Sequence, residues 1–312
     1  MTFILGHHPM TFDAVLIAGP TASGKSAAAL ALAEKIGGAA INADSMQVYA
    51  EAPILTAQPD AAAKARVPHL LYGHVQAREL YSVGRYAEDA ARALREVQSM
   101  NRVPVFVGGT GMYFMALEEG LASIPDISPD IRAQARALLD EIGVEALHTR
   151  LAARDPETAA GLRPTDPQRT LRAWEVLEAT GRPLVEWQRA PAEPVLKGMK
   201  LARILLDPPR EALRAAIAAR FETMVHAGGL REARALEGLD PSLPAAKLLG
   251  LRPLQALARG QMSEKAAISE AVTATRQFAK RQMTWFRGRM PHYLRYDPLK
   301  SNIIAVFNEI SV

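Results

Sequence analysis

The sequence predicts an α/β fold built on a parallel sheet, and three observations lead to this prediction. Short apolar runs alternate with stretches of strong helix formers through the first third of the chain. A glycine-rich turn joins the first apolar run, residues 13–19, to the first helical stretch, residues 26–35. Between residues 117 and 196, helical stretches follow one another without a strand-like run, so we expect a helical insertion domain.

The elements of the first third can be justified in order. Residues 13–19 end in glycine and are typical of a strand buried on both faces. A pair of glycines after residues 26–35 predicts the end of that helix. Strands are expected at residues 39–43 and 103–107, with a helix over residues 82–100. This order favours a parallel sheet with crossover helices.

The remaining elements complete the sheet after the insertion. The helices expected in the insertion lie at residues 128–141, 144–153, 158–163 and 167–180. An apolar run at residues 200–207 predicts one more strand. Residues 210–295 predict several helices, broken at Gly228-Gly229, Pro241, Pro244 and Gly260. We therefore expect a first core segment, a helical insertion domain, and a core completion with a basic C-terminal part, at residues 1–116, 117–196 and 197–312.

Composition narrows the class of protein. The 312 residues are 49% hydrophobic and carry 37 Lys and Arg against 33 Asp and Glu, a formal net charge of +4. This composition excludes intrinsic disorder. Cys is absent, which excludes disulfides, thiolate metal sites and cysteine nucleophiles. Residues 1–7 fit neither a signal peptide nor an anchor, and no segment reaches the ~18 apolar residues of a membrane span. We expect a cytoplasmic protein without a membrane partner.

The strongest local motif is a G-x-x-x-x-G-K-S pattern between the first strand and its helix. It consists of Gly19, Pro20, Thr21, Ala22, Ser23, Gly24, Lys25 and Ser26. In such a P-loop, backbone N–H groups and the helix N-terminus surround phosphate oxygens, and Lys25 adds a full positive charge. Ser26 is then placed to ligate Mg²⁺. The alternative is a glycine turn that binds nothing.

Two loops at the ends of the next strands add candidate side chains. Asp44 follows the second strand, where it is either a helix N-cap or a carboxylate beside the phosphate cradle. The strand at residues 103–107 ends in Gly108-Gly109-Thr110, where ordinary P-loop NTPases carry the acid that orders magnesium. The missing acid counts against routine NTP hydrolysis, although the loop could also be a plain strand-to-helix turn.

Two further segments point to a polyanionic partner. Residues 273–295 contain no Asp or Glu, and aromatic residues are interleaved with the cations Arg276, Lys280, Arg281, Arg287, Arg289 and Arg295. Such a surface suits phosphate contacts and base stacking, but it could also be the solvated face of a helix. Residues 166–172 open a helix with polar side chains that could reach phosphates, or they are simply a capped helix start.

Taken together, these segments resemble the tRNA dimethylallyltransferases, also called tRNA isopentenyltransferases (the IPP transferase family). The resemblance covers nearly the whole chain. In order, it rests on residues 19–26, 42–49, 108–113, 166–169, 182–188 and 275–287. Each segment alone is weak, but the ordered set is specific.

The resemblance implies a P-loop NTPase-like core with a helical insertion that closes on the anticodon stem-loop. It implies transfer of a dimethylallyl group from dimethylallyl diphosphate to N6 of the adenosine 3′ of the anticodon in tRNA, with Mg²⁺ as cofactor. Lys25 and Mg²⁺ at Ser26 would neutralise the diphosphate leaving group. Asp44 matches the general base and Thr110 a residue that contacts the tRNA or the reacting groups. A monomer suffices for one anticodon arm.

The resemblance also assigns binding residues. The diphosphate would be held by the P-loop and by Arg252. The residues expected to contact tRNA are Asp44, Ser45, Met46, Gln47, Thr110, Arg132, Gln168, Arg169, Thr170, Leu171, Arg172, Arg276, Lys280 and Arg281. The chain departs from the family at residues 50–59, where a basic contact is replaced by Gln58, and at Leu251, where Tyr is usual.

Two other function classes remain open at this level. A small-molecule or nucleotide kinase would share the P-loop but would need a magnesium-ordering acid and an ATP base pocket. A non-catalytic RNA-binding ATPase would use only the P-loop and the basic segment, and its activity would survive substitution of Asp44.

Overall fold

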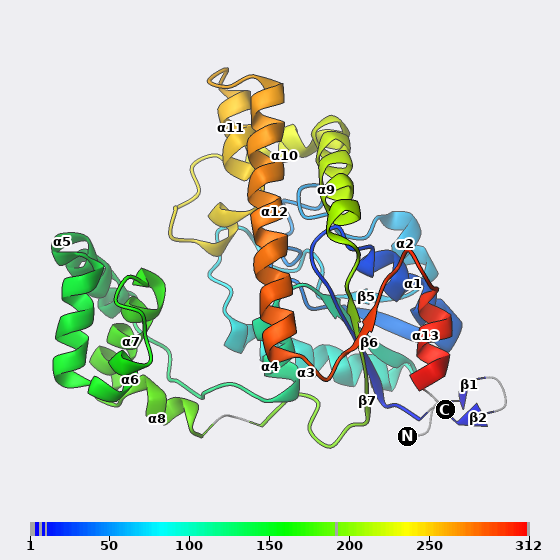
Figure 1. Cartoon of the computed structure of the whole chain (residues 1–312), viewed down its shortest axis with the longest axis horizontal. Helices are drawn as coiled ribbons and strands as arrows, with labels where there is room; N and C mark the ends of the chain where they lie inside the picture. Colours follow the sequence, from blue (N-terminus) through cyan, green and yellow to red (C-terminus); the bar gives the residue numbers. More distant parts are fainter. Residues whose placement is uncertain (1–3, 6–7, 10, 191–192, 311–312) are drawn as a thin grey trace. The chain divides into compact units, whose positions relative to one another are not determined.

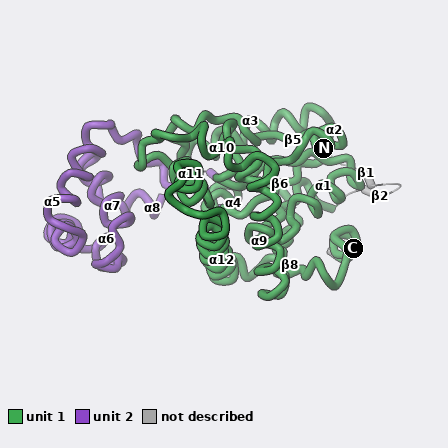
Figure 2. Tube along the Cα trace, turned by 90° about the horizontal axis from the view of Figure 1, so that it is seen from above, with its two compact units in different colours: residues 1–117, 195–312 green, residues 118–194 purple. Residues whose placement is uncertain are grey.

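The chain forms two compact units. The computed structural model describes residues 4–5, 8–9, 11–190 and 193–310. Unit 1 comprises residues 1–117 and 195–312, and unit 2 comprises residues 118–194 (Figure 2). The first unit contains the sheet and the second is helical.

The described residues of unit 1 form a six-stranded parallel sheet in the order β5-β4-β6-β3-β7-β8 (Figure 1). Its strands are β3 (Ala14–Ala18), β4 (Gly38–Asn42), β5 (His69–Leu70), β6 (Val103–Gly108), β7 (Leu201–Leu206) and β8 (Leu294–Tyr296). A separate two-stranded antiparallel pair joins β1 (Ile4–Leu5) and β2 (His8–Pro9). The α/β prediction with a parallel sheet is thus confirmed.

The central strand β3 is buried on both faces because helices cover the sheet from both sides. Val15 and Ile17 pack in one cluster with α1 (Lys25–Ile36) and α13 (Ile303–Ile310). Leu16 points the other way, into a larger cluster with α3 (Val83–Ser99) and α4 (Gly111–Glu118). This alternation follows from the two-residue period of a strand and explains why the strand is apolar throughout.

The C-terminal half of unit 1 adds helices above the sheet edge where the parallel strands end. They are α9 (Arg210–Met224), α10 (Leu230–Ala235), α11 (Leu251–Ala258) and the long α12 (Glu264–Arg289). The short helix α2 (Ala61–Arg66) belongs to the first half of the chain, between β4 and β5. A π-helical turn (Val225–Gly229) and a 3₁₀ turn (Pro244–Lys247) fall at two of the breaks expected from the sequence. In Figure 1, α12 runs beside α9 and α11, with which it is in contact.

Unit 2 is a helical body with its own core. It contains α5 (Pro129–Arg154), α6 (Pro156–Ala160), α7 (Pro167–Thr180) and α8 (Leu184–Gln188). The two helices expected at residues 128–141 and 144–153 form one element, interrupted at Gly143, whose φ is 77°. The core includes the fully buried Leu147 and Leu151 from α5 and Val176 from α7.

Some sequence expectations were wrong in detail. The edge strands β5 and β8, with two and three residues, were not predicted, since so few residues show no apolar period. The helix expected at residues 158–163 lies at Pro156–Ala160, where Asp155 caps it by accepting from Thr158 N–H at 3.0 Å. Among the described residues, none of the helices combines the length and hydropathy needed to cross a membrane.

The end of β6 offers a direct test of the fold. A Cβ added to Gly108 would lie 1.9 Å from the Ala43 carbonyl oxygen, so Gly108→Ala must displace backbone. We expect a loss of at least about 2 kcal/mol in the free energy of unfolding. Gly288 in α12 has no atom within 4 Å of an added Cβ, and Gly288→Ala should stabilise by about 0.5–1 kcal/mol. Denaturant unfolding measures both, and equal midpoints would contradict this account.

Candidate active site

The glycine-rich turn forms a phosphate cradle between β3 and α1. Ala22 and Gly24 have φ angles of 64° and 84°, and this left-handed backbone turns successive N–H groups inward before the helix begins at Lys25. Ser23 Oγ is buried and, among the described residues, has no hydrogen-bond partner. Ser26 is exposed in the first turn of α1. A loop of this shape with an unsatisfied hydroxyl is suited to an anion with several oxygens.

Two buried charged side chains, Lys25 and Asp44, and the half-buried Arg220 meet beside this cradle. Lys25 Nζ lies 3.7 Å from Asp44 Oδ2, and an Arg220 guanidinium nitrogen donates to Thr21 Oγ1 at 2.6 Å. Burial lowers the pKa of Lys25, an effect opposed by Asp44 and reinforced by Arg220. Burial also lowers the pKa of Arg220, again against the pull of Asp44. Two cations therefore share one carboxylate, which leaves a net positive charge where phosphate would lie.

Arg220 is not among the site residues predicted from the sequence. It lies in α9, nearly two hundred residues from the P-loop, in a segment whose composition is that of an ordinary amphipathic helix. Only the packing of α9 over the cradle reveals it. No local motif could have distinguished it from the exposed Arg214 on the same helix.

The glycine loop after β6 lies against the loops after β3 and β4. Gly19 N–H donates to the Gly108 carbonyl at 3.2 Å, and Thr110 N–H donates to the Ala43 carbonyl at 3.2 Å. Thr110 Oγ1 accepts from Ser45 N–H at 2.8 Å. Because an added Cβ on Gly108 would collide with Ala43, the structure has no room there for the acid of ordinary P-loop NTPases.

Asp44 is held in a turn, and no α-helix starts there, so the N-cap interpretation is wrong. Its Oδ1 accepts from Met46 N–H at 3.0 Å. The Asn42 side chain accepts from Asp44 N–H at 2.9 Å and donates to the carbonyls of Asp44 and Leu71, each at 3.0 Å. These bonds satisfy the buried amide and fix the backbone that carries the carboxylate.

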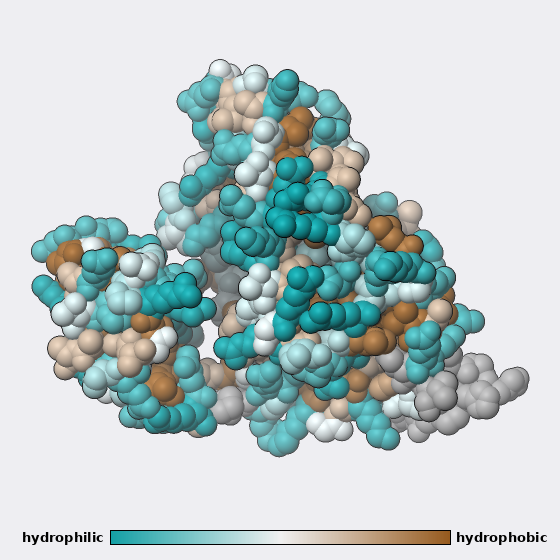
Figure 3. Space-filling view, in the orientation of Figure 1, coloured by the Kyte–Doolittle hydropathy of each residue, from teal (hydrophilic) through white to brown (hydrophobic). Residues whose placement is uncertain are grey.

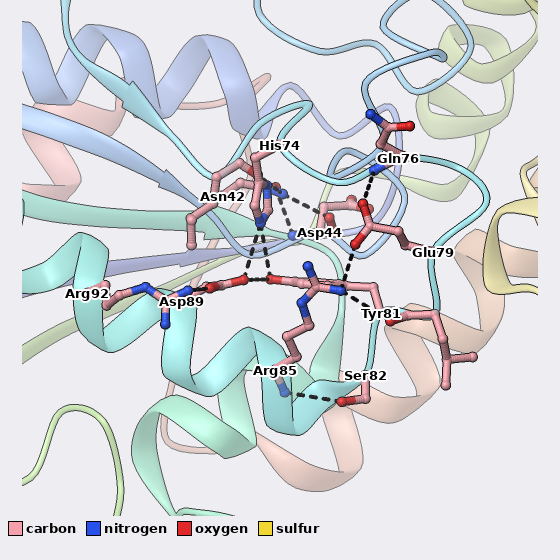
Figure 4. A network of polar contacts seen from close by, with 12 residues as sticks. Asn42, Asp44, His74, Gln76, Glu79, Tyr81, Ser82, Arg85, Asp89 and Arg92 are labelled. Atoms are coloured by element: carbon pink, nitrogen blue, oxygen red, sulfur yellow. Dashed lines mark hydrogen bonds and ion pairs between the residues drawn. The ribbon is translucent and has the colours of Figure 1, made fainter. Parts of the chain in front are cut away.

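A second polar network stands behind this turn, on the loop that connects β5 to α3 (Figure 4). The buried Asp89 on α3 accepts from Tyr81 Oη at 2.8 Å and pairs with Arg92. His74 Nε2 lies 3.4 Å from the same carboxylate. Asp89 thereby connects residues 74–81 to α3. It stabilises the loop whose Leu71 carbonyl accepts a hydrogen bond from the Asn42 side chain.

Asp44 lines a cavity that has one polar end and largely apolar walls. The cavity is lined by Thr21, Asp44, Met46, Leu55, Thr56, Arg220, Phe221, Met224, Leu248, Leu249, Thr275 and Phe278. Thr21, Asp44 and Arg220 provide the polar end, next to the cradle. The arrangement suits a ligand with an anionic head and a short apolar body.

The loop at residues 50–59, which departs from the expected family pattern, builds one wall of this cavity. Glu232 on α10 accepts from Ile54 N–H at 2.8 Å and from Leu55 N–H at 2.8 Å. Burial raises the pKa of Glu232, and the two N–H donors oppose this effect. The carboxylate thus holds Leu55 at the cavity.

Glutamine side chains brace the same loop. Gln47 Nε2 donates to the carbonyls of Thr56 and Ala57, at 2.9 and 2.7 Å. Gln58 Nε2 donates to the Tyr49 carbonyl at 2.8 Å. The amide of Gln47 thus binds protein backbone, and Gln58 takes a structural position in place of the basic contact expected there.

Comparisons with known proteins agree on one family. A model of the IPP transferase family matches residues 47–289. The chain is 50% identical over 289 residues to a tRNA dimethylallyltransferase of Azorhizobium caulinodans, covering 91% of this chain and 92% of that protein. A relative of the same name from Rhodospirillum centenum is 50% identical over 292 residues, covering 93% of both. The chain belongs to the IPP transferase family.

Solved structures support the assignment. A tRNA isopentenylpyrophosphate transferase from Bacillus halodurans is 30% identical, with a TM-score of 0.66 and 96% of both chains covered. A eukaryotic dimethylallyltransferase acting on tRNA is 26% identical, with a TM-score of 0.73, covering 88% of this chain and 69% of that one. The resemblance inferred from the ordered motifs is therefore confirmed.

In this family member, the cations expected on the C-terminal helix are exposed. Arg276, Lys280 and Arg281 lie on the solvent side of α12. In Figure 3, hydrophilic side chains cover much of the face over α9 and α12. Arg287 is also exposed but pairs with Asp207 at 3.0 Å. These positions remain available to a polyanion.

The interleaved aromatic residues do not form a stacking surface. Phe286 and Tyr293 are buried in the core, so the expectation of base stacking is wrong for these two. Phe278 lines the cavity, and Trp285 packs so close to Gly111 that an added Cβ would lie 2.3 Å from its ring. Phe286 and Trp285 pack α12 against α4, through Phe114 and Gly111.

In unit 2, the start of α7 divides into outward and inward residues. Gln168 and Arg169 are exposed, and Arg169 lies 3.6 Å from Asp166. Thr170 and Leu171 face inward, and Leu171 packs in the core of the unit. Contact between these two buried residues and tRNA stays a prediction.

Two arginines of unit 2 lie near each other. Burial lowers the pKa of Arg172, an effect opposed by Glu175 and reinforced by Arg132. Arg132 also donates to the Ile127 carbonyl at 3.2 Å. The neighbouring positive charges make this part of unit 2 a candidate for phosphate contact.

Arg252 does not join the cradle. It lies on α11 and lines a separate pocket, together with Leu236, Gly238, Leu239, Pro241, Ala246, Leu251 and Gln255. Contact between Arg252 and the diphosphate stays a prediction, and the arginine that lies at the P-loop in the structure is Arg220.

The lowered pKa of Lys25 predicts how anion binding depends on pH. Only the charged ammonium attracts diphosphate, and the bound anion raises the pKa again, so binding takes up a proton. Affinity for inorganic diphosphate should therefore fall as pH rises through the lowered pKa of Lys25. Calorimetry across pH measures this effect. Lys25→Arg is the control, because its charge persists and only the titration of diphosphate itself remains.

If wild type and Lys25→Arg showed the same pH dependence of affinity, Lys25 would not titrate at the cradle.

Proposed function

We propose that this protein transfers a dimethylallyl group from dimethylallyl diphosphate to N6 of the adenosine 3′ of the anticodon in tRNA, releasing diphosphate. The observation that carries the proposal is the position of Asp44. This carboxylate lies beside Lys25 of the phosphate cradle and also lines the cavity with apolar walls. One group can therefore meet both an anionic leaving group and a nucleophile.

The cradle binds the diphosphate of the donor. Backbone N–H groups of the P-loop, Lys25 and Arg220 surround the anion, and their charges oppose the charge that develops as the carbon–oxygen bond breaks. The apolar wall formed by Phe221, Met224 and Leu248 takes the five-carbon chain. Because an allylic carbon ionises readily, assistance to the leaving group is the larger part of catalysis.

Asp44 accepts the proton from the nucleophile. Adenine N6 is weakly nucleophilic because its lone pair is delocalised into the ring, so a carboxylate within reach accelerates attack. N6 forms the new bond to the allylic carbon, the bonding electrons leave with diphosphate, and the N6 proton passes to Asp44. Diphosphate also draws Lys25 away from Asp44, which frees the carboxylate to act as the base.

Magnesium fits the cradle through Ser26. Its side chain is exposed at the first turn of α1, and Ser23 Oγ beside it is unsatisfied, so hydroxyl oxygens are available next to the phosphate position. Mg²⁺ keeps several waters and needs few protein ligands when phosphate oxygens supply the rest. Bound there, it would neutralise charge on the diphosphate.

The tRNA meets exposed cations. Arg276, Lys280 and Arg281 on α12 offer phosphate contacts on unit 1, and Arg169 offers one on unit 2. The target base leaves its stack to reach Asp44, as enzymes that modify a base require. Since tRNA is a cytoplasmic substrate and one anticodon arm needs one protein, we further propose a cytoplasmic monomer.

The kinase alternative lacks support at the end of β6. A kinase needs an acid to order magnesium, and the contact between Gly108 and Ala43 excludes a side chain there.

The test is incubation of the purified protein with Mg²⁺, unmodified tRNA and either dimethylallyl diphosphate or ATP, followed by mass analysis of the nucleosides. We expect a five-carbon addition to adenosine that depends on the allylic diphosphate. ATP consumption without tRNA modification would contradict the proposal and favour the kinase.

Asp44→Asn tests the base. The amide keeps the size of the side chain but cannot accept the proton, so we expect turnover to fall by about 10²–10⁴-fold. Affinity for tRNA should change little, since phosphate contacts dominate it. Single-turnover transfer and filter binding measure the two quantities. Near-normal turnover by Asp44→Asn would remove the general-base role.

A further inference from the structure

Gln282 on α12 connects the two loops that meet at the reaction centre. The side chain is buried, with 6% exposure. Its Oε1 accepts from Thr21 N–H in the P-loop at 2.9 Å, and its Nε2 donates to the Gly109 carbonyl in the glycine loop at 2.8 Å. A backbone N–H can only donate and a carbonyl can only accept, so the orientation of the amide is fixed by its partners.

The amide and the carboxylate of Asp44 face the same small space. An added Cβ on Gly109 would lie 2.3 Å from Gln282 Nε2, 3.2 Å from Asp44 Oδ2 and 3.1 Å from the Gly19 carbonyl. Glycine is required at residue 109 because three separate chain segments converge on its Cα. Gln282 therefore bridges the P-loop and the loop of Thr110, next to the backbone bond from Gly19 N–H to the Gly108 carbonyl.

The hydrogen bond from Thr21 to Gln282 also determines which P-loop groups are left to bind an anion. The N–H of Thr21 is taken by Gln282, while its hydroxyl accepts from Arg220. Thr21 thus serves to place Arg220 and the start of the P-loop. Ser23 N–H donates to the Pro20 carbonyl at 3.2 Å, so the N–H groups of the first turn of α1 remain for the anion. Met or Leu at residue 282 could fill the volume of Gln282 but could make neither bond.

We propose that Gln282 is a positioning residue that sets the distance between the diphosphate cradle and the loops that carry Asp44 and Thr110. The inference rests on the proposed transfer reaction. The donor binds to the cradle, and the base lies across the gap that Gln282 spans. Loss of the bridge therefore misaligns donor and base while leaving both binding surfaces present.

Misalignment of this kind lowers kcat more than it weakens binding. A displacement of about 1 Å between reacting groups can cost about 10²-fold in rate. For Gln282→Met we expect kcat in single-turnover transfer to fall by about 10- to 100-fold. The KM for dimethylallyl diphosphate and the Kd for inorganic diphosphate should change by less than about threefold.

Gln255→Met is the matched control. Gln255 on α11 also makes two hydrogen bonds to backbone, donating to the carbonyls of Ala233 and Leu236 at 3.2 and 3.0 Å, but it lies outside the cradle and the cavity. The same substitution there likewise removes two bonds between a side chain and the backbone. Thermal midpoints should fall similarly in the two variants, whereas kcat should fall only in Gln282→Met.

Gln282→Glu provides a second variant if Gln282→Met does not fold. The carboxylate keeps an acceptor for Thr21 N–H but offers no donor to the Gly109 carbonyl, so kcat should again fall. Its negative charge beside the cradle also raises the KM for the anionic donor, so kcat at saturating donor is the deciding quantity for this variant. Wild-type kcat in a folded Gln282 variant, or a loss confined to KM, would overturn the inference. Absence of transfer by the wild-type protein would instead overturn the proposed function.

Discussion

The candidate active site depends on two cations that share one carboxylate in a place largely shielded from water. Lys25 is buried and Arg220 is half-buried beside the single carboxylate of Asp44, and burial lowers the pKa of each cation. Burial of an excess cation costs stability, and a bound polyanion relieves that cost. The site is thus built to gain most when a multiply charged phosphate binds, and the carboxylate that partly compensates the cations is released when it does.

Close backbone approach makes this arrangement possible. Gly108 presses against Ala43, and Gly109 lies between Asp44 and Gln282. These contacts bring the ends of β3, β4 and β6 so near each other that an acidic side chain does not fit at the end of β6. Asn42 and Glu232 then fix the loops on either side through backbone N–H groups. Asn42 and Glu232 are buried, as Lys25 and Asp44 are.

The strongly apolar central strands and the P-loop could be predicted from the sequence, because burial on both faces and the phosphate-binding turn each leave a local pattern. The family could be predicted as well, since six weak motifs in order are specific. Arg220 and Gln282 could not be recognised as site residues, because each lies on a helix of ordinary composition and meets the P-loop only through packing. Phe286 and Tyr293 were expected at the surface but are buried, because motif membership does not show which side of a helix a residue faces. The edge strands were too short to show any period.

Binding of inorganic diphosphate to Arg220→Met tests the central claim most directly. Arg214→Met is the control, since Arg214 is an exposed arginine of the same helix, 3.0 Å from Glu211. Calorimetry should show that Arg220→Met weakens the Kd by at least about tenfold, the loss of one charge-assisted contact. Arg214→Met should bind as the wild type does. Equal affinities in all three proteins would contradict the role of the cation pair.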